Sequence, residues 1–144
     1  MTDSWVGFRP SPKRDDTRPT ASQDFETSTD LLIPKVLKLL VTQQGVESWL
    51  VTFTKFDARL GAKLKFTLND ENYGGTYARI DIPKRVIFLT EFHGELDFRL
   101  TEKKDGTDIV LSCSKTLNEQ EKPAWEDTVK ECFARFKGAL TNGI

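Results

Sequence analysis

Hydrophobic and polar residues alternate through the middle of the chain in the way that is typical of half-buried β-strands. The alternation predicts six consecutive strands, at residues 52–59, 62–69, 76–82, 85–93, 96–101 and 109–114. Short turn segments separate these strands, and Asp105-Gly106 is a dipeptide that favours a tight hairpin. Consecutive strands with short connections predict an antiparallel meander that has one apolar face.

The pattern changes on both sides of this meander. Residues 23–33 predict a first strand, which ends before Pro34 because proline cannot donate to a strand ladder and suits the first turn of a helix. Residues 36–41 are too densely apolar for a half-exposed strand and predict a short buried helix, and residues 46–50 predict a second helical turn. After residue 118 the period becomes 3.6, and a long helix places one apolar stripe along Trp125, Val129, Cys132, Phe133, Phe136 and Leu140.

These elements predict an α+β domain over residues 22–144. A curved antiparallel β-sheet wraps around the long C-terminal α-helix, with two short helices after the first strand, because only the final helix has a stripe long enough to cover the sheet. Residues 1–21 predict a polar tail that is disordered or loosely docked, since proline, serine, threonine and charged residues dominate it. Trp5 and Phe8 in this tail are either idle or a short partner-binding motif.

Composition narrows the classes of function. The formal net charge of −1 argues against bulk attraction to nucleic acid. No apolar stretch approaches the roughly 20 residues that cross a bilayer, so we expect no membrane insertion. The polar N-terminus and the two isolated cysteines, Cys113 and Cys132, indicate a cytoplasmic protein with buried free thiols. The single histidine, His93, is predicted to be solvent-exposed, and neither a metal site nor a cofactor is expected.

Short motifs follow one another in a specific order along residues 22–144. They are Pro34 before a helix, Gly45 with Trp49-Leu50, Leu60-Gly61-Ala62-Lys63-Leu64-Lys65-Phe66, Gly75-Thr76 with Ile80-Asp81, Pro83-Lys84-Arg85-Val86, Gly106-Thr107 with Val110-Leu111, and a long helix with Trp125. This order resembles the START-like, Bet v 1-type (SRPBCC) superfamily, in the branch similar to the C-terminal domain of the activator of Hsp90 ATPase. The resemblance implies a helix-grip fold with a hydrophobic cavity between the sheet and the C-terminal helix. It assigns no catalytic residue, because functional residues vary between members.

The alternation of faces predicts which side chains line such a cavity. They are Phe53, Phe66, Ala78, Phe88, Thr90, Phe98, Leu111, Val129, Cys132 and Phe133. Pockets of this kind hold a ligand by apolar burial, with a few polar groups that orient it. The alternative is that the same side chains fill a solid core. Thr90 either orients a ligand or is satisfied by the backbone.

Three functions remain open. The first is a binding protein for a hydrophobic or amphipathic small molecule or lipid. The second is a cyclase or dehydratase-like enzyme, which would need an acid or base pair inside the cavity, and the pattern supplies none. The third is a stress or co-chaperone-like interaction module with a filled core. Tyr77, Ile87 and Leu89 are predicted on the outer sheet face and suggest a homodimer there, unless the tail or long basic side chains cover them.

Overall fold

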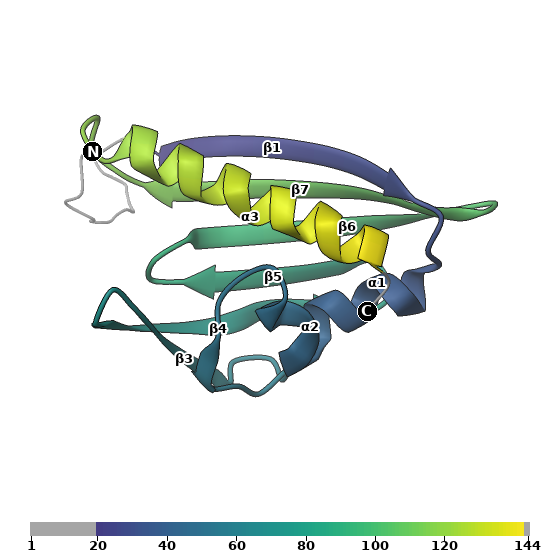
Figure 1. Cartoon of the computed structure of the whole chain (residues 1–144), viewed down its shortest axis with the longest axis horizontal. Helices are drawn as coiled ribbons and strands as arrows, with labels where there is room; N and C mark the ends of the chain where they lie inside the picture. Colours follow the sequence, from purple (N-terminus) through teal and green to yellow (C-terminus); the bar gives the residue numbers. More distant parts are fainter. Residues whose placement is uncertain (1–19, 143–144) are drawn as a thin grey trace, which may run out of the picture.

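The computed structural model describes residues 20–142 and contains one seven-stranded sheet with α3 lying across it (Figure 1). Every neighbouring pair of strands is antiparallel, in the order β1-β7-β6-β5-β4-β3-β2. The predicted α+β helix-grip is confirmed. Along the chain the elements are β1 (Thr20–Thr29), α1 (Ile33–Val41), α2 (Gln43–Glu47), β2 (Phe53–Lys55), β3 (Lys63–Leu68), β4 (Glu71–Asp81), β5 (Arg85–Thr90), β6 (Gly94–Lys103), β7 (Gly106–Thr116) and α3 (Lys122–Asn142).

The first strand pairs with the last one, over ten residues in unbroken register. Thr20 and Ala21, which were predicted to belong to the tail, are already paired at the start of β1, and residues 1–19 of that tail lie outside the described residues. The strand also ends earlier than predicted, because the side-chain oxygen of Thr29 accepts a hydrogen bond from the Leu31 backbone N–H at 3.2 Å and turns the chain.

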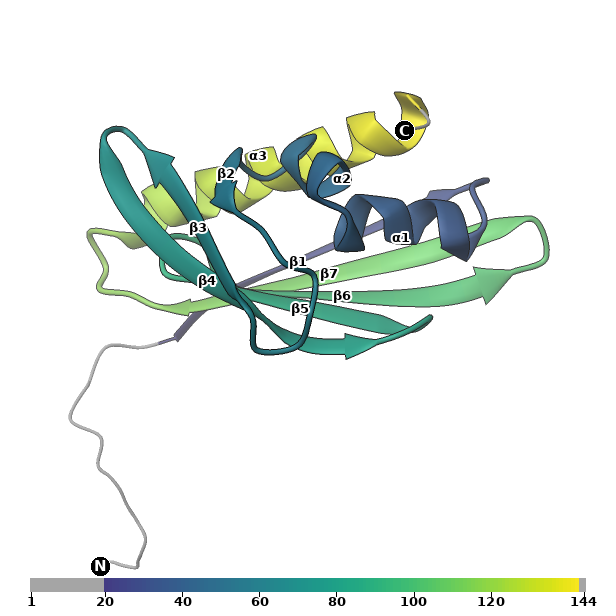
Figure 2. The same cartoon turned by 90° about the horizontal axis from the view of Figure 1, so that it is seen from below.

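All three helices lie on one side of the sheet, as the view from below shows (Figure 2). This side is concave, and α3 faces it with a stripe of buried side chains. The stripe consists of Trp125, Val129, Cys132, Phe133, Phe136, Ala139 and Leu140. The stripe that the sequence predicts for the last helix is therefore confirmed, with Ala139 added to it.

A bulge in β4 reverses the faces that the sequence predicts for its first half. Tyr77 pairs with Phe88 and Arg79 pairs with Ile87, so Ala78 is the extra residue between two ladder positions. Because of this extra residue, the alternation that places even-numbered side chains on the inner face after the bulge does not hold before it. Two predictions are therefore wrong: Ala78 is exposed and lines no interior space, and Tyr77 is a completely buried core residue instead of an outer-face one.

The connection between β3 and β4 is shorter than predicted. Asn69 and Asp70 both have positive φ, 52° and 67°, and together they form the whole turn. Asparagine and aspartate tolerate this left-handed backbone better than other residues with a side chain. Gly74 and Gly75, which were assigned to a turn, consequently lie inside β4, opposite Lys65 and Leu64 of β3.

Candidate functional site

Nine of the ten residues predicted to line a cavity are buried in the core between the sheet and the helices; Ala78 is the exception. Four of them, Phe53, Phe66, Phe88 and Phe98, belong to two aromatic clusters. The Trp49 cluster, which consists of Trp49, Phe88, Phe98 and Phe136, lies near α1 and α2. The His93 cluster, which consists of Phe53, Phe66, Tyr73, Phe92 and His93, lies around β3, β4 and the β5–β6 turn.

The Trp49 cluster fills its half of the concave side. The indole of Trp49 makes edge contacts with Phe88, Phe98 and Phe136 at centroid distances of 5.7, 5.2 and 5.5 Å. Its Nε1–H donates to the Leu39 carbonyl oxygen at 2.7 Å, so the ring is held at both ends. Aromatic side chains packed edge to face in this way leave a close-packed interior. This half of the fold therefore matches the solid-core alternative.

The His93 cluster has a polar group at its centre. The ring of His93 lies 5.8 Å from Phe66 and 5.0 Å from Phe92, and the side chain is 1% exposed. The prediction of a solvent-exposed histidine is wrong. The chain reverses at Gly94, which has a φ of 81°, and the Trp125 Nε1–H of α3 donates to the His93 carbonyl oxygen at 2.8 Å. These contacts hold the turn under the helix, which an isolated hairpin pattern does not reveal.

Thr90 fixes the orientation of this histidine. Its hydroxyl oxygen accepts from the His93 backbone N–H at 2.8 Å and lies 2.9 Å from Nδ1 of the ring. The hydroxyl proton then has Nδ1 as its acceptor, so Nδ1 is unprotonated and Nε2 carries the ring proton. Within residues 20–142, no acceptor lies within hydrogen-bond distance of Nε2.

The environment keeps the imidazole neutral. Burial, together with the positive charges of Lys115 and Arg135, lowers the pKa of His93 to about 4. At neutral pH the ring is therefore a neutral hydrogen-bond donor at Nε2. A base needs a proton acceptor aimed at its substrate and a pKa near the working pH, and this ring offers neither.

The two cysteines are free and buried, as predicted. Burial raises the pKa of Cys113 to about 12 and that of Cys132 to about 11. Because the thiolate is the nucleophile, both groups are unreactive at neutral pH. Within the described residues, the only buried carboxylate is Asp97, which lies on the convex side of the sheet. The concave side therefore presents no buried acid pair in this part of the chain.

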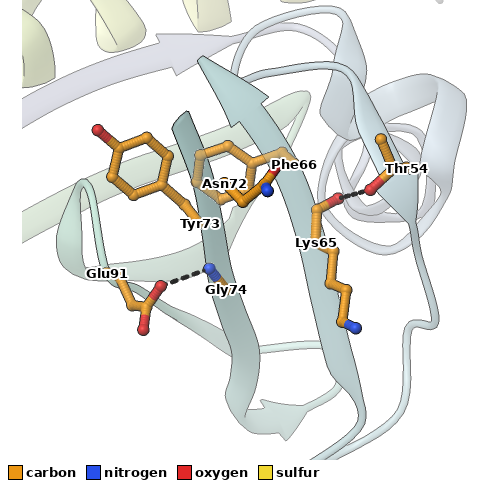
Figure 3. A pocket seen from close by; sticks show the side chains of 7 residues that line it. All are labelled: Thr54, Lys65, Phe66, Asn72, Tyr73, Gly74 and Glu91. Atoms are coloured by element: carbon orange, nitrogen blue, oxygen red, sulfur yellow. Dashed lines mark hydrogen bonds between the residues drawn. The ribbon is translucent and has the colours of Figure 1, made fainter. Parts of the chain in front are cut away.

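Two adjoining grooves lie over β3, β4 and β5 and share the convex-face residues Lys65, Gly74 and Glu91. One of about 430 Å³ is lined by Thr54, Lys65, Phe66, Asn72, Tyr73, Gly74 and Glu91 (Figure 3). The other, of about 620 Å³, runs beside Lys63, Leu64, Lys65, Gly74, Gly75, Thr76, Leu89, Thr90 and Glu91. Gly74 of β4 pairs with Lys65 of β3, and because it has no side chain it leaves room between Lys65 and Glu91. Glu91 accepts a hydrogen bond from the Gly74 N–H at 2.6 Å and borders both grooves.

The outer apolar patch is smaller than predicted. Leu89 is 46% exposed, but Ile87 is only 9% exposed. Ile87 lies beside Asp97, which Arg85 holds by hydrogen bonds of 3.0 and 2.7 Å and which Arg99 contacts at 3.2 Å. Ile87 is therefore largely buried, and Leu89 remains as the exposed apolar residue of the predicted three.

Two further features bear on function. Residues 20–142 contain no group of three or more His, Cys, Asp or Glu side chains arranged as metal ligands. No helix in the same part of the chain has the length and apolar character that crossing a bilayer requires.

Several solved structures share this fold. The Aha1 dimer of Colwellia psychrerythraea is 17% identical, with a TM-score of 0.64 over 83% of this chain and 92% of that chain. A protein of Mesorhizobium loti is 12% identical, with a TM-score of 0.70 over 86% of this chain and 99% of that chain. DynU16, from the dynemicin biosynthetic locus, is 14% identical, with a TM-score of 0.67 over 90% of this chain and 49% of that chain. Identities this low show the fold alone.

Sequence comparison identifies the branch within this fold. No curated protein sequence matches the chain. The model of the family described as "Activator of Hsp90 ATPase homolog 1-like protein" matches residues 32–141. The matched segment begins just before α1, includes the whole meander and ends one residue before the end of α3. The chain therefore belongs to the activator of Hsp90 ATPase homolog 1-like family, within the START-like superfamily.

Proposed function

We propose that the domain binds an apolar or amphipathic small molecule between the sheet and α3, at the His93 cluster. The observation that carries this proposal is the buried Nε2 of His93, which has no hydrogen-bond partner among the described residues and carries the ring proton in the tautomer assigned above. A buried donor that is left unpaired costs roughly 1–3 kcal/mol, so folded proteins rarely keep one without a use. A ligand oxygen that accepts from Nε2 would remove this penalty.

The surroundings of His93 suit such a ligand. The rings of Phe66 and Phe92 flank the imidazole, and Phe66 in turn contacts Phe53 and Tyr73 at 5.9 and 5.5 Å. Ligand sites are typically apolar surfaces with a small number of oriented polar groups, and this cluster has that composition. We place the ligand here rather than near Trp49, because the Trp49 cluster already fills its half of the core.

The direct test is native mass spectrometry of the purified protein, followed by displacement of 1-anilinonaphthalene-8-sulfonate by a panel of oxygen-bearing and hydrocarbon ligands of equal size. His93→Leu removes the donor, and we expect it to weaken the oxygen-bearing ligands about tenfold while leaving hydrocarbons unchanged. Absence of a co-purified molecule together with absence of dye binding would refute the proposal.

A matched pair of enlarged side chains tests the location. Val129 of α3 is fully buried, one helical turn after Trp125, so Val129→Phe enlarges a side chain on the helix face that covers the sheet and should reduce ligand binding. Leu89→Phe adds an aromatic ring on the convex face and should leave ligand binding unchanged. Equal binding by both variants would place the ligand elsewhere.

Self-association is a second candidate function, and one observation favours it. The groove beside Leu89 has a volume of about 620 Å³, and this leucine is exposed within it. Exposed apolar side chains in a groove with polar margins often mark a protein interface. The similar Colwellia protein is a dimer, and this supports self-association as a candidate function of this chain.

A further inference from the structure

One row of side chains crosses the convex face of four neighbouring strands. The register pairs Lys63 with Thr76, Thr76 with Leu89, and Leu89 with Glu95. Since neighbouring strands lie about 4.8 Å apart, the row places a cation and a carboxylate about 14 Å from each other, with the exposed Leu89 between them. We call these four residues the Lys63–Glu95 row.

The charges at the two ends of the row form no direct ion pair within residues 20–142, although Glu95 helps to raise the pKa of Arg85, which bonds to Asp97. Lys63 and Glu95 are both exposed. Next to them, Asp97 is held by Arg85 and Arg99, so the convex face does form ion pairs where opposite charges are close. The charges of the Lys63–Glu95 row are thus available to a partner.

The adjacent row repeats the same order of charges. Lys65 is paired with Gly74, and Glu91 continues this row beyond β5, because its backbone N–H donates to the Gly74 carbonyl oxygen at 2.9 Å. The Glu91 carboxylate also accepts from the Gly74 N–H (Figure 3). Lysines therefore lie on β3 in both rows, and glutamates lie on the side of β5 and β6. Gly74 lies between Lys65 and Glu91, in β4, where its missing side chain leaves part of the groove, whereas Gly75 pairs with the buried Leu64 and Thr90.

We propose that the Lys63–Glu95 row is one half of a two-fold symmetric interface with a second copy of this chain. This proposal rests on self-association, the second candidate function, and does not depend on any ligand. The axis runs between β4 and β5, parallel to the strands. Rotation about it places Lys63 opposite the partner's Glu95, and Leu89 opposite the partner's Thr76. Each contact occurs twice, so a face with separated charges becomes complementary to itself.

A charge-swap series measured by sedimentation equilibrium tests this pairing. Lys63→Glu and Glu95→Lys each bring like charges together twice, and each should weaken the dimer at least about tenfold. The double variant Lys63→Glu/Glu95→Lys restores opposite charges at both contacts and should recover most of the affinity of the unmodified chain. A rescue of this kind requires that the two residues meet across the interface.

An apolar pair of variants provides the control. Leu89→Asp places a charge in the middle of the row and should abolish association. Leu32→Asp changes a leucine that is 55% exposed at the start of α1, away from this face, and should leave the dimer intact. Circular dichroism spectra and melting temperatures of all variants check that each one is folded.

Three results would overturn the inference. A chain that stays monomeric at every concentration would reject both self-association and the pairing. A dimer that is indifferent to both single swaps would leave self-association standing and reject this interface. A double variant no tighter than the single ones would show that Lys63 and Glu95 do not face each other.

Discussion

The hydroxyl group of Tyr77 donates a 2.6 Å hydrogen bond to the carbonyl oxygen of Leu40, which joins the middle of the sheet to α1. Both groups are buried, and burial raises the pKa of the tyrosine far above its usual value, so the phenol stays protonated. The bulge at Ala78 makes this contact possible, because it turns Tyr77 toward the core. Sheet and helix are thus tied by a polar contact inside an apolar core.

Removing this hydroxyl group should destabilise the fold. In Tyr77→Phe the Leu40 carbonyl oxygen loses its donor inside the core, and we expect the free energy of unfolding to fall by about 1–2 kcal/mol, measured by urea denaturation. Tyr73→Phe is the matched control, because its hydroxyl contacts the exposed Glu71 at 3.3 Å. Equal effects of the two variants would contradict a specific role for the Tyr77–Leu40 bond.

The buried histidine should make stability depend on pH. The pKa of His93 is about 4 in the folded chain and about 6.5 in an unfolded one. Between these values the unfolded chain binds more protons, so stability is complete above about pH 6.5 and is lost as the pH falls toward 4, by roughly 3 kcal/mol in total.

Urea denaturation between pH 4 and pH 7 measures this dependence. The variant His93→Leu has no imidazole to titrate, and its stability should decline less over the same interval. If both chains lost stability equally, the acid sensitivity would come from other groups.

The ion pair of Arg85 with Asp97 on the convex face should stabilise the fold, because the carboxylate is buried. Asp97 has a side chain that is 4% exposed, and Arg85 reaches it with two hydrogen bonds. Arg85→Leu leaves the carboxylate with Arg99 alone, and we expect a loss of about 1–3 kcal/mol in chemical denaturation. Arg59→Leu removes the partner of Asp57, where the arginine side chain is 79% exposed, and should leave stability nearly unchanged. The opposite ranking of the two variants would refute this assignment.

Two glycines should respond to alanine in opposite directions. At Gly106 an added Cβ would lie 2.0 Å from the Thr29 carbonyl oxygen, so Gly106→Ala must separate β7 from the end of β1. At Gly138 nothing lies within 4 Å of an added Cβ, and the residue is inside α3. Gly138→Ala should therefore stabilise the protein, by up to about 1 kcal/mol, while Gly106→Ala lowers the melting temperature. If Gly106→Ala were stabilising instead, β7 and the end of β1 would be able to move apart at this point without a loss of stability.

Local periodicity was sufficient to predict the elements of this protein. The 3.6-residue stripe from Trp125 to Leu140 specifies a helix with one buried face, and the alternation around Leu64 and Phe66 specifies a strand with one buried face. These patterns depend only on residues a few positions apart, and burial of the apolar face then requires the helix to cover the sheet. The family followed from the order of such elements and of the motifs between them.

Only the tertiary structure decided which distant segments meet and which way the side chains face. The pairing of β1 with β7 joins residues almost a hundred positions apart, and no local pattern encodes it. The bulge at Ala78 changed the face of Tyr77, because one extra residue inverts an alternation of period two. The burial of His93 came from Thr90 in the sheet and Trp125 in the helix acting together on one turn. The candidate ligand site rests on that burial, since an imidazole in water would leave no donor unpaired.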